Sequence, residues 1–465
     1  MSSQEASERA GTTREAIALA FAEFLLVPTV VIVAFALLAA GTFLLDRSEA
    51  EWLAPARDAL KAAIFANAGA TADLLGTIAG GIITITSITV SLLLIALQQS
   101  ASALTHQVYD QFLRNRMNQF YFGFFVGLSL FALATLSSVG PLNPVIGGTV
   151  ALASTAVALY LLLVLFYTTV NQMRPVVIIE AIHHHALVAR EAQRDFLLRT
   201  RRASELQAPV HVPVATSQHG FVTRIDVDAI EAATKRAAAA VEVLLRVSVG
   251  TYVVFGQVLA DVKAHTSSDA ETVGKVLESA IRRQDKRDLA ADPLDGVEEL
   301  ETIGWTSIST AQSDADSGVL TIYALRDLLA RWCEPQSGSG NRPAAPVVYV
   351  DDVVPRVLNA FESLLVSASE SMQHQSCAEI LSTFEIVFAR LRPQEQRHVE
   401  DIVLRSLAAL GDHVLTSELE RAIGRLVAVL EKAGRRETAK ALRAATDALS
   451  RSIGKLNSRA TRVPQ

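Results

Sequence analysis

The sequence contains little cysteine. Among its 465 residues there are two, Cys333 and Cys377. Two cysteines cannot build the disulfide framework of a small secreted domain, and these two form neither a Cys-x-x-Cys pair nor a Cys/His spacing typical of metal ligands. The sequence therefore excludes a disulfide-stapled domain and a zinc ribbon.

Charge is also scarce, and no positively charged surface is indicated. Charged residues make up 19% of the chain, with 42 Lys and Arg against 48 Asp and Glu and a formal net charge of −6. A nucleic-acid binder needs clustered basic residues, so we expect no nucleic-acid partner. Half of the residues are hydrophobic and the mean hydropathy is +0.31, above the usual range of water-soluble domains.

Catalytic signatures are missing too. There is no phosphate-binding glycine loop, dinucleotide fingerprint, nucleophile elbow or HExxH zinc motif. Three consecutive histidines, His183, His184 and His185, point about 100° apart on a helix, so one helix cannot direct all three at one metal. We expect no enzyme activity, no cofactor and no catalytic, cofactor-binding or metal site, and we assign these histidines no role.

Long apolar runs are what the sequence does have. Four of them, at residues 19–45, 70–97, 120–139 and 145–170, reach the roughly 20 helical residues that cross a hydrocarbon core. We predict an α-helical polytopic membrane domain of four transmembrane helices, followed by a cytoplasmic α+β region that contains a small barrel-sandwich-like β unit and a helical bundle.

The distribution of arginine predicts the orientation. Arg114 and Arg116 lie between the second and third runs, and Arg174 follows the fourth, whereas the turn at 140–144 has no basic residue. Because Lys and Arg favour the cytoplasmic side, both termini are predicted to be cytoplasmic, in a bacterial inner membrane.

The second apolar run carries a polar stripe. On a helical wheel its small and polar residues fall within one arc, with apolar residues opposite. The stripe consists of Asp73, Thr77, Gly80, Thr84, Ser87, Ser91 and Gln98. It is either a face for close helix packing or the wall of an aqueous path, because polar groups in a membrane face protein or water.

The rest of the chain divides by pattern. We expect a tail at 1–18, the membrane domain at 19–172, a juxtamembrane helix at 173–209, a β unit with an inserted helix at 210–265, a helical region at 266–334, a Pro/Gly/Ser-rich linker at 335–346 and a C-terminal helical bundle at 347–465. The predicted helices include one at 270–287.

Two glycines organise the predicted β unit. Gly250 and Gly256 separate short β-branched runs and are expected at turns, since glycine accepts positive φ. The pattern looks like barrel-sandwich carrier domains, but the lysine that such carriers need at a hairpin tip is absent, because Lys235 lies in the inserted helix. We therefore expect a structural role for this unit.

In order, these features resemble the bacterial family of predicted membrane proteins called domain of unknown function 2254. The motifs that carry the resemblance are Ser87–Leu92, Ala96–Ser100, Phe112–Arg116, Ile182-His183-His184, Gly220–Asp226, Gly250–Leu259 and Asp292-Pro293. Relatives have a proline- and asparagine-containing loop where this chain has 309–318, ahead of Ala324–Leu328, so any role of that loop is in doubt here. The resemblance implies the architecture and no activity.

Two functions remain open. In the first, copies of the chain form a homo-oligomer around a channel-like path lined by the polar stripe and gated by the cytoplasmic part. In the second, the chain is a membrane-anchored scaffold or sensor that binds a cytoplasmic partner without conduction. Besides the lipid bilayer, the predicted partners are therefore a second copy or a cytoplasmic protein. Four spans alone enclose too little space, so the first function requires symmetry.

Overall fold

The computed structural model describes residues 25–48, 54–65, 67–103, 116–140, 142–172, 174–288, 290–309, 314–334, 344–410 and 414–452. The expected tail at 1–18 and most of the expected linker at 335–346 lie outside these ranges. The chain divides into two compact units, Met1–Arg174 and Pro175–Gln465, which we call the membrane unit and the extramembrane unit.

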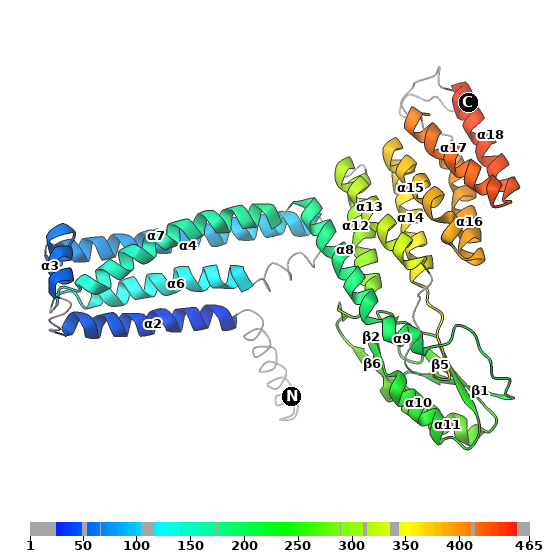
Figure 1. The fold of residues 1–465 in the computed structure, drawn as a ribbon, viewed down its shortest axis with the longest axis horizontal. Helices are drawn as coiled ribbons and strands as arrows, with labels where there is room; N and C mark the ends of the chain where they lie inside the picture. Colours follow the sequence, from blue (N-terminus) through cyan, green and yellow to red (C-terminus); the bar gives the residue numbers. More distant parts are fainter. Residues whose placement is uncertain are drawn as a thin grey trace, which may run out of the picture. The chain divides into compact units, whose positions relative to one another are not determined.

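The membrane unit consists of long apolar helices (Figure 1). They are α2 (Leu26–Arg47), α4 (Ala68–Ala103), α6 (Arg116–Ser137) and α7 (Val145–Gln172), and the short α3 (Ala54–Ala63) lies between the first two. Each of the four long helices is long and apolar enough to cross a membrane, which confirms four candidate spans. The helix α3 was not predicted. The beginning of the first predicted span, before residue 25, lies outside the description.

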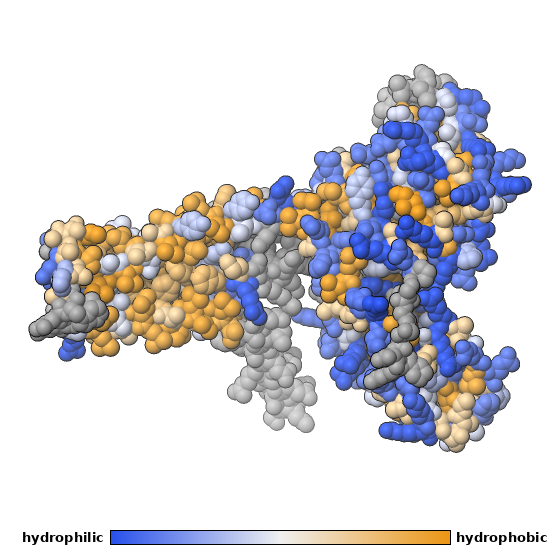
Figure 2. Space-filling model, viewed as in Figure 1, coloured by the Kyte–Doolittle hydropathy of each residue, from blue (hydrophilic) through white to orange (hydrophobic). Residues whose placement is uncertain are grey.

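The core of this unit lies around α6. Phe125, Leu128 and Phe131 of α6 are almost completely buried, and they pack with Phe35 of α2 and with the apolar face of α4. The outer surface of the helices is also mostly apolar on the face shown in Figure 2, where orange side chains predominate. A helical unit that is apolar both inside and outside is suited to a bilayer rather than to water.

The extramembrane unit begins with α8 (Pro175–Ala192) and α9 (Arg194–Arg199), so the helix predicted to leave the membrane is broken at Gln193. The helices from residue 293 onward lie in the regions that were predicted to be helical. They are α12 (Pro293–Ile308), α13 (Ala315–Trp332), α14 (Val353–Glu370), α15 (His374–Val387), the 3₁₀ turn η3 (Phe388–Arg390), α16 (Pro393–Leu410), α17 (Ser417–Lys432) and α18 (Arg436–Ser452). Their buried faces are aliphatic and aromatic, as in Phe361 and Phe384, which pack edge to face.

Two small sheets form the β part. Strands β1 (Val210–Ala215), β5 (Val258–Ala264), β3 (Val241–Leu245) and β7 (Val347–Val348) form one sheet in that order. The second sheet has the order β4 (Tyr252–Val253), β2 (Gly220–Ile225) and β6 (Ile281–Gln284). Helices α10 (Val227–Arg236) and α11 (Ser267–Ala280) share the core of the strands. The inserted helix is confirmed, and Gly250 and Gly256 lie at turns with φ of +89° and +80°, as predicted.

The helix predicted at 270–287 is wrong in its second half. It ends at Ala280, and Ile281–Gln284 forms β6, antiparallel to β2 with Ile281 opposite Ile225. β7, which the sequence placed at the start of the C-terminal bundle, pairs in parallel with β3. The sheets therefore recruit strands from outside 210–265, because strand pairing depends on partners distant in sequence. The likeness to barrel-sandwich domains stays a prediction.

Candidate functional site

The polar stripe lies on the exposed face of α4. Asp73, Thr77, Gly80, Thr84, Ser87 and Ser91 are all exposed, whereas the side chain of Gln98 lies outside the description. The opposite face of α4 is the one that packs within the chain, with Leu75, Ile78 and Ile82 buried against α6. Among the described residues of one chain, therefore, the stripe is neither a packing face nor an internal path.

Three hydroxyls of the stripe donate to their own helix. Thr77 Oγ1 donates to the carbonyl of Asp73 at 2.8 Å, Thr84 Oγ1 to that of Gly80 at 2.8 Å, and Ser91 Oγ to that of Ser87 at 3.0 Å. A hydroxyl that donates its one proton backwards presents only oxygen lone pairs outwards. The stripe thus offers a row of hydrogen-bond acceptors, and α4 contains no Lys or Arg.

Glycines distinguish this face from the interior of the unit. A Cβ added at Gly76, Gly80 or Gly81 of α4 would meet no atom within 4 Å. On α6 the situation is reversed, since a Cβ at Gly123 would lie 2.8 Å from Pro28 Cα and one at Gly127 would lie 2.5 Å from Phe35 Cδ2. The α6 glycines permit close approach of α2, whereas Gly76, Gly80 and Gly81 of α4 have no such neighbour among the described residues.

A polar cluster fixes the end of the membrane unit where the stripe begins. The carboxylate of Asp46 accepts from the backbone amides of Ile146 at 2.8 Å and Gly147 at 2.9 Å, at the N-terminus of α7. A carboxylate at this end of a helix is favoured by the helix dipole. Thr71 Oγ1 at the start of α4 donates to Asn143 Oδ1 at 2.7 Å. These bonds hold the beginning of α4 beside the turn that precedes α7.

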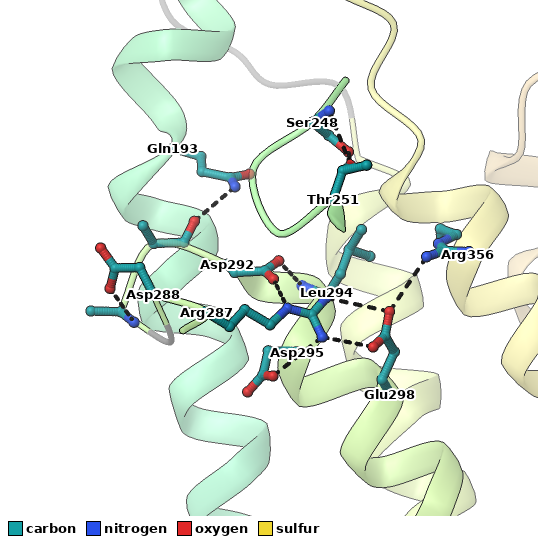
Figure 3. A network of polar contacts seen from close by, with 12 residues as sticks. Gln193, Ser248, Thr251, Arg287, Asp288, Asp292, Leu294, Asp295, Glu298 and Arg356 are labelled. Carbon is teal, nitrogen blue, oxygen red and sulfur yellow. Dashed lines mark hydrogen bonds and ion pairs between the residues drawn. The ribbon is translucent and has the colours of Figure 1, made fainter. Parts of the chain in front are cut away.

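In the extramembrane unit, Arg287 is surrounded by three carboxylates (Figure 3). Its Nε donates to Asp292 Oδ2 at 2.5 Å, its Nη1 to Glu298 Oε2 at 2.7 Å, and Nη1 also lies 3.4 Å from Asp295 Oδ1. Arg356 of α14 reaches Glu298 Oε1 at 3.4 Å. We call Arg287 with these three carboxylates the Arg287 cluster.

Asp292 is the buried member of the Arg287 cluster. It is fully buried and caps α12, because its Oδ1 accepts from the Leu294 amide at 3.0 Å. Burial raises the pKa of Asp292 to about 6, although Arg287 opposes this shift. The site requires Gly250, since a Cβ there would lie 1.9 Å from Asp292 Oδ2. The turn at Gly250 in the β part therefore packs directly against the start of α12.

The helix that follows the last span contacts this region. Gln193, just after α8, donates to the carbonyl of Ala291 at 2.9 Å beside the Arg287 cluster (Figure 3). One turn earlier, the nearly buried Arg190 forms a bidentate pair with Asp351. Further up α8, His183 Nε2 lies 2.8 Å from Asp327 Oδ2 of α13. Hydrogen bonds from Arg331 and His183 lower the pKa of Asp327, outweighing the effect of burial.

The family of predicted membrane proteins designated DUF2254 matches residues 22–381, which span both units. The chain belongs to this family. No curated protein matches it, and no solved structure does.

The structure brings together several of the motifs that carry the resemblance in the sequence. Asp292-Pro293 lies against Gly250, and Gly296, one turn into α12, lies against Ile182 and Ala186 of α8. His183 pairs with Asp327, the aspartate of the Ala324–Leu328 motif. Sequence reasoning missed Arg287, although an arginine five residues before a helix-capping aspartate was a visible signal. Within the described residues, His184 and His185 are exposed, and no group of three acidic, His or Cys side chains is arranged to hold a metal.

Proposed function

We propose that this chain assembles as a homo-oligomer in the bacterial inner membrane, with the outer faces of α4 lining a path for small cations. The observation that carries the proposal is that the polar and glycine-rich face of α4 is exposed on the single chain, while its apolar face packs on α6. A second copy would cover this face, and symmetry would enclose a path that one chain cannot.

The chemistry of the stripe supports a cation over an anion. Outward lone pairs of Thr77, Thr84 and Ser91 act as oxygen ligands, which hard cations prefer. Asp73 adds the one formal charge of α4, at the end of the stripe, and that charge is negative. An anion would meet acceptors and a carboxylate, and no donor strong enough to replace its water.

The extramembrane unit is proposed to gate the path. Only two residues separate the end of α7 at Gln172 from the start of α8 at Pro175, and α8 packs along α12 and α13. We propose that a shift of those helices reaches the last span through this short connection. We propose no enzymatic reaction for this unit.

Both termini are proposed to lie in the cytoplasm. In the described structure Ala62 of α3 and Ala203 after α9 are exposed, so cysteines introduced there are accessible to reagents. With both native cysteines replaced, an impermeant maleimide should label Ala62→Cys in intact cells and should label Ala203→Cys only after lysis. The opposite pattern would invert the topology.

Cation flux and assembly state, measured on the same variants, test the proposal. Thr84→Leu and Ser87→Leu place apolar bulk on the stripe, and Ala156→Leu makes a similar change on the exposed face of α7 as the control. In vesicles containing the purified chain, we expect K⁺ flux in the wild type and in Ala156→Leu. We expect no flux in the two stripe variants, with the oligomer retained on size exclusion.

The other results have distinct meanings. Loss of the oligomer in the stripe variants would show that the stripe is a helix-packing face, because a small-residue contact cannot admit leucine. An oligomer without flux in the wild type would favour the membrane-anchored scaffold that binds a cytoplasmic partner. A monomeric wild type with no flux would overturn both the path and the oligomer.

A further inference from the structure

An exposed apolar turn of the extramembrane unit connects β4 of the three-stranded sheet to β5 of the four-stranded sheet. Phe255 is 79% exposed, and Tyr252, Val254 and Val258 are also exposed, all within seven residues. Single exposed apolar side chains are ordinary on a protein surface, but several on one turn indicate an interaction site. This group, Tyr252, Val254, Phe255 and Val258, is called the apolar turn below.

The backbone of the apolar turn is held by hydrogen bonds. Gly256 has φ of +80°, the third position of a type II turn, and its amide donates to the carbonyl of Thr216 at 2.9 Å. The Gln257 side chain accepts from the Val254 amide at 3.0 Å, and the Gln257 carbonyl accepts from Thr216. The ring of Tyr252 packs edge to face on Phe221 at 5.0 Å. The apolar side chains are therefore held outwards by hydrogen bonds rather than left on a loose loop.

Basic side chains lie on the three-stranded sheet that contains Tyr252, toward its end farther from the turn, where Arg224 is three residues past Phe221, the strand partner of Tyr252. The strands β2, β4 and β6 contain Arg224, Arg282 and Arg283 and no acidic residue. Arg224 and Arg282 are directly opposite each other on neighbouring strands, both are exposed, and neither forms an ion pair with any residue of the described chain. Like charges placed opposite each other repel, so an anion beside them would be stabilising.

We infer that the apolar turn docks on the surface of an anionic lipid bilayer, with Phe255 and Val254 at the level of the headgroups and Arg224 and Arg282 against lipid phosphates. Aromatic side chains favour the membrane interface, and basic side chains are attracted to anionic lipids. The four spans keep the chain at a bilayer, so the local concentration of this surface is always high. This inference does not depend on the proposed conduction.

Lipid-borne quenchers test the docking in the full-length chain. A fluorophore on Gln218→Cys, with Cys333→Ser and Cys377→Ala, reports on the turn without altering it, because Gln218 is exposed two residues after Thr216. The control label is Ser268→Cys, past the far end of β5 and roughly 20 Å away along that strand. In nanodiscs containing nitroxide-labelled lipids, we expect quenching at 218 and none at 268, and stronger quenching with phosphatidylglycerol than with phosphatidylcholine.

Variants separate the two contributions. Phe255→Ser with Val254→Ser should abolish the quenching, and Arg224→Gln with Arg282→Gln should abolish its dependence on phosphatidylglycerol. Leu404→Ser, an exposed apolar residue on α16, and Lys275→Gln, an exposed lysine on α11, should change neither. No quenching at 218 in either lipid overturns the inference. The inference is also overturned if the label at 218 becomes more buried as the protein density rises but is not quenched by the labelled lipid. The turn would then contact another copy of the protein.

Discussion

Glycines occupy two contrasting surroundings in this molecule. Gly127 of α6 and Gly250 before the apolar turn are closely surrounded, because a Cβ would lie 2.5 Å from Phe35 and 1.9 Å from Asp292. Gly80 of α4 has nothing within 4 Å of the same position. The absence of a side chain at Gly127 and Gly250 is explained by these close neighbours within the chain.

This difference separates glycines that a neighbour within the chain explains from glycines that no described neighbour explains. A glycine inside a helix lowers stability relative to alanine by roughly 0.5–1 kcal/mol, so it persists where something requires it. For Gly127 that requirement is the approach of α2. For Gly80 no neighbour within the described chain supplies it, and the proposed oligomer does. The predictions below test each side of this comparison.

The largest effect is expected at the Arg287 cluster, which Gly250 makes room for. Arg287→Met should lower the free energy of unfolding by about 3–5 kcal/mol, since it leaves a buried carboxylate unpaired. The pKa of Asp292 is raised above its ordinary value, so its contribution to stability is lost as pH rises through about 6. The loss caused by Arg287→Met should therefore be larger at pH 8 than at pH 5 in denaturant unfolding followed by tryptophan fluorescence.

A second substitution serves as the control. Asn at position 292 still accepts from the Leu294 amide but carries no charge. Arg287→Met with Asp292→Asn should therefore recover most of the lost stability and remove the difference between the two pH values. A loss of equal size at both pH values would mean that the buried charge of Asp292 is not the cause.

Gly250→Ala should follow in size. Its φ of +89° disfavours alanine, and the new methyl would overlap Asp292, so we expect a loss of roughly 2–4 kcal/mol from strain and overpacking together. Gly256→Ala is the matched control, with φ of +80° but open space, and should lose roughly 1–2 kcal/mol from strain alone. Equal losses would show that Asp292 does not press on Gly250.

Much of the architecture could be predicted from the sequence because it depends on local patterns. The four candidate spans are long apolar runs, and Asp292 caps α12 beside a proline in its first turn. Both features depend on residues that are close together in the sequence. Gly250 and Gly256 were expected at turns for their backbone freedom. These features need no knowledge of distant partners.

The features that were missed depend on distant contacts. Ile281–Gln284 continues a helical pattern, and only its pairing with β2 makes it a strand. Arg287 looks like an ordinary surface arginine until three carboxylates of the next helix surround it. The stripe on α4 was identified from its helical period. The face of α4 that packs on α6 is determined by side chains of α6 such as Phe125 and Leu128, and the period of α4 alone does not contain that information.

A smaller effect is expected on α6. Gly127→Ala should lower the free energy of unfolding by about 1–3 kcal/mol, because the methyl is forced against the buried ring of Phe35. Gly41→Ala on α2 meets no atom and should change it by less than about 1 kcal/mol. Thermal unfolding in detergent, at a protein concentration where the chain is monomeric, makes the measurement. If both variants behave alike, the close approach of α2 and α6 is not what requires glycine at 127.

The smallest change in chain stability, and the most informative one, is expected at Gly80. Alanine there meets nothing within the chain, so Gly80→Ala should leave the unfolding of the monomer unchanged or raise its free energy by up to roughly 1 kcal/mol. If a second copy lies against this face, the same methyl should weaken assembly, which mass photometry of the detergent-solubilised chain would detect as a shift toward monomer. Gly41→Ala, equally open in the single chain, should not shift it. An unchanged oligomer in Gly80→Ala and in the bulkier Gly80→Leu would mean that this part of the stripe is not a contact between copies. K⁺ flux retained in Gly80→Leu would then mean that it faces lipid, where the hydroxyls of Thr77, Thr84 and Ser91 already donate to their own helix. The contrast between the glycines of α4 and α6 would then reflect helix flexibility rather than assembly.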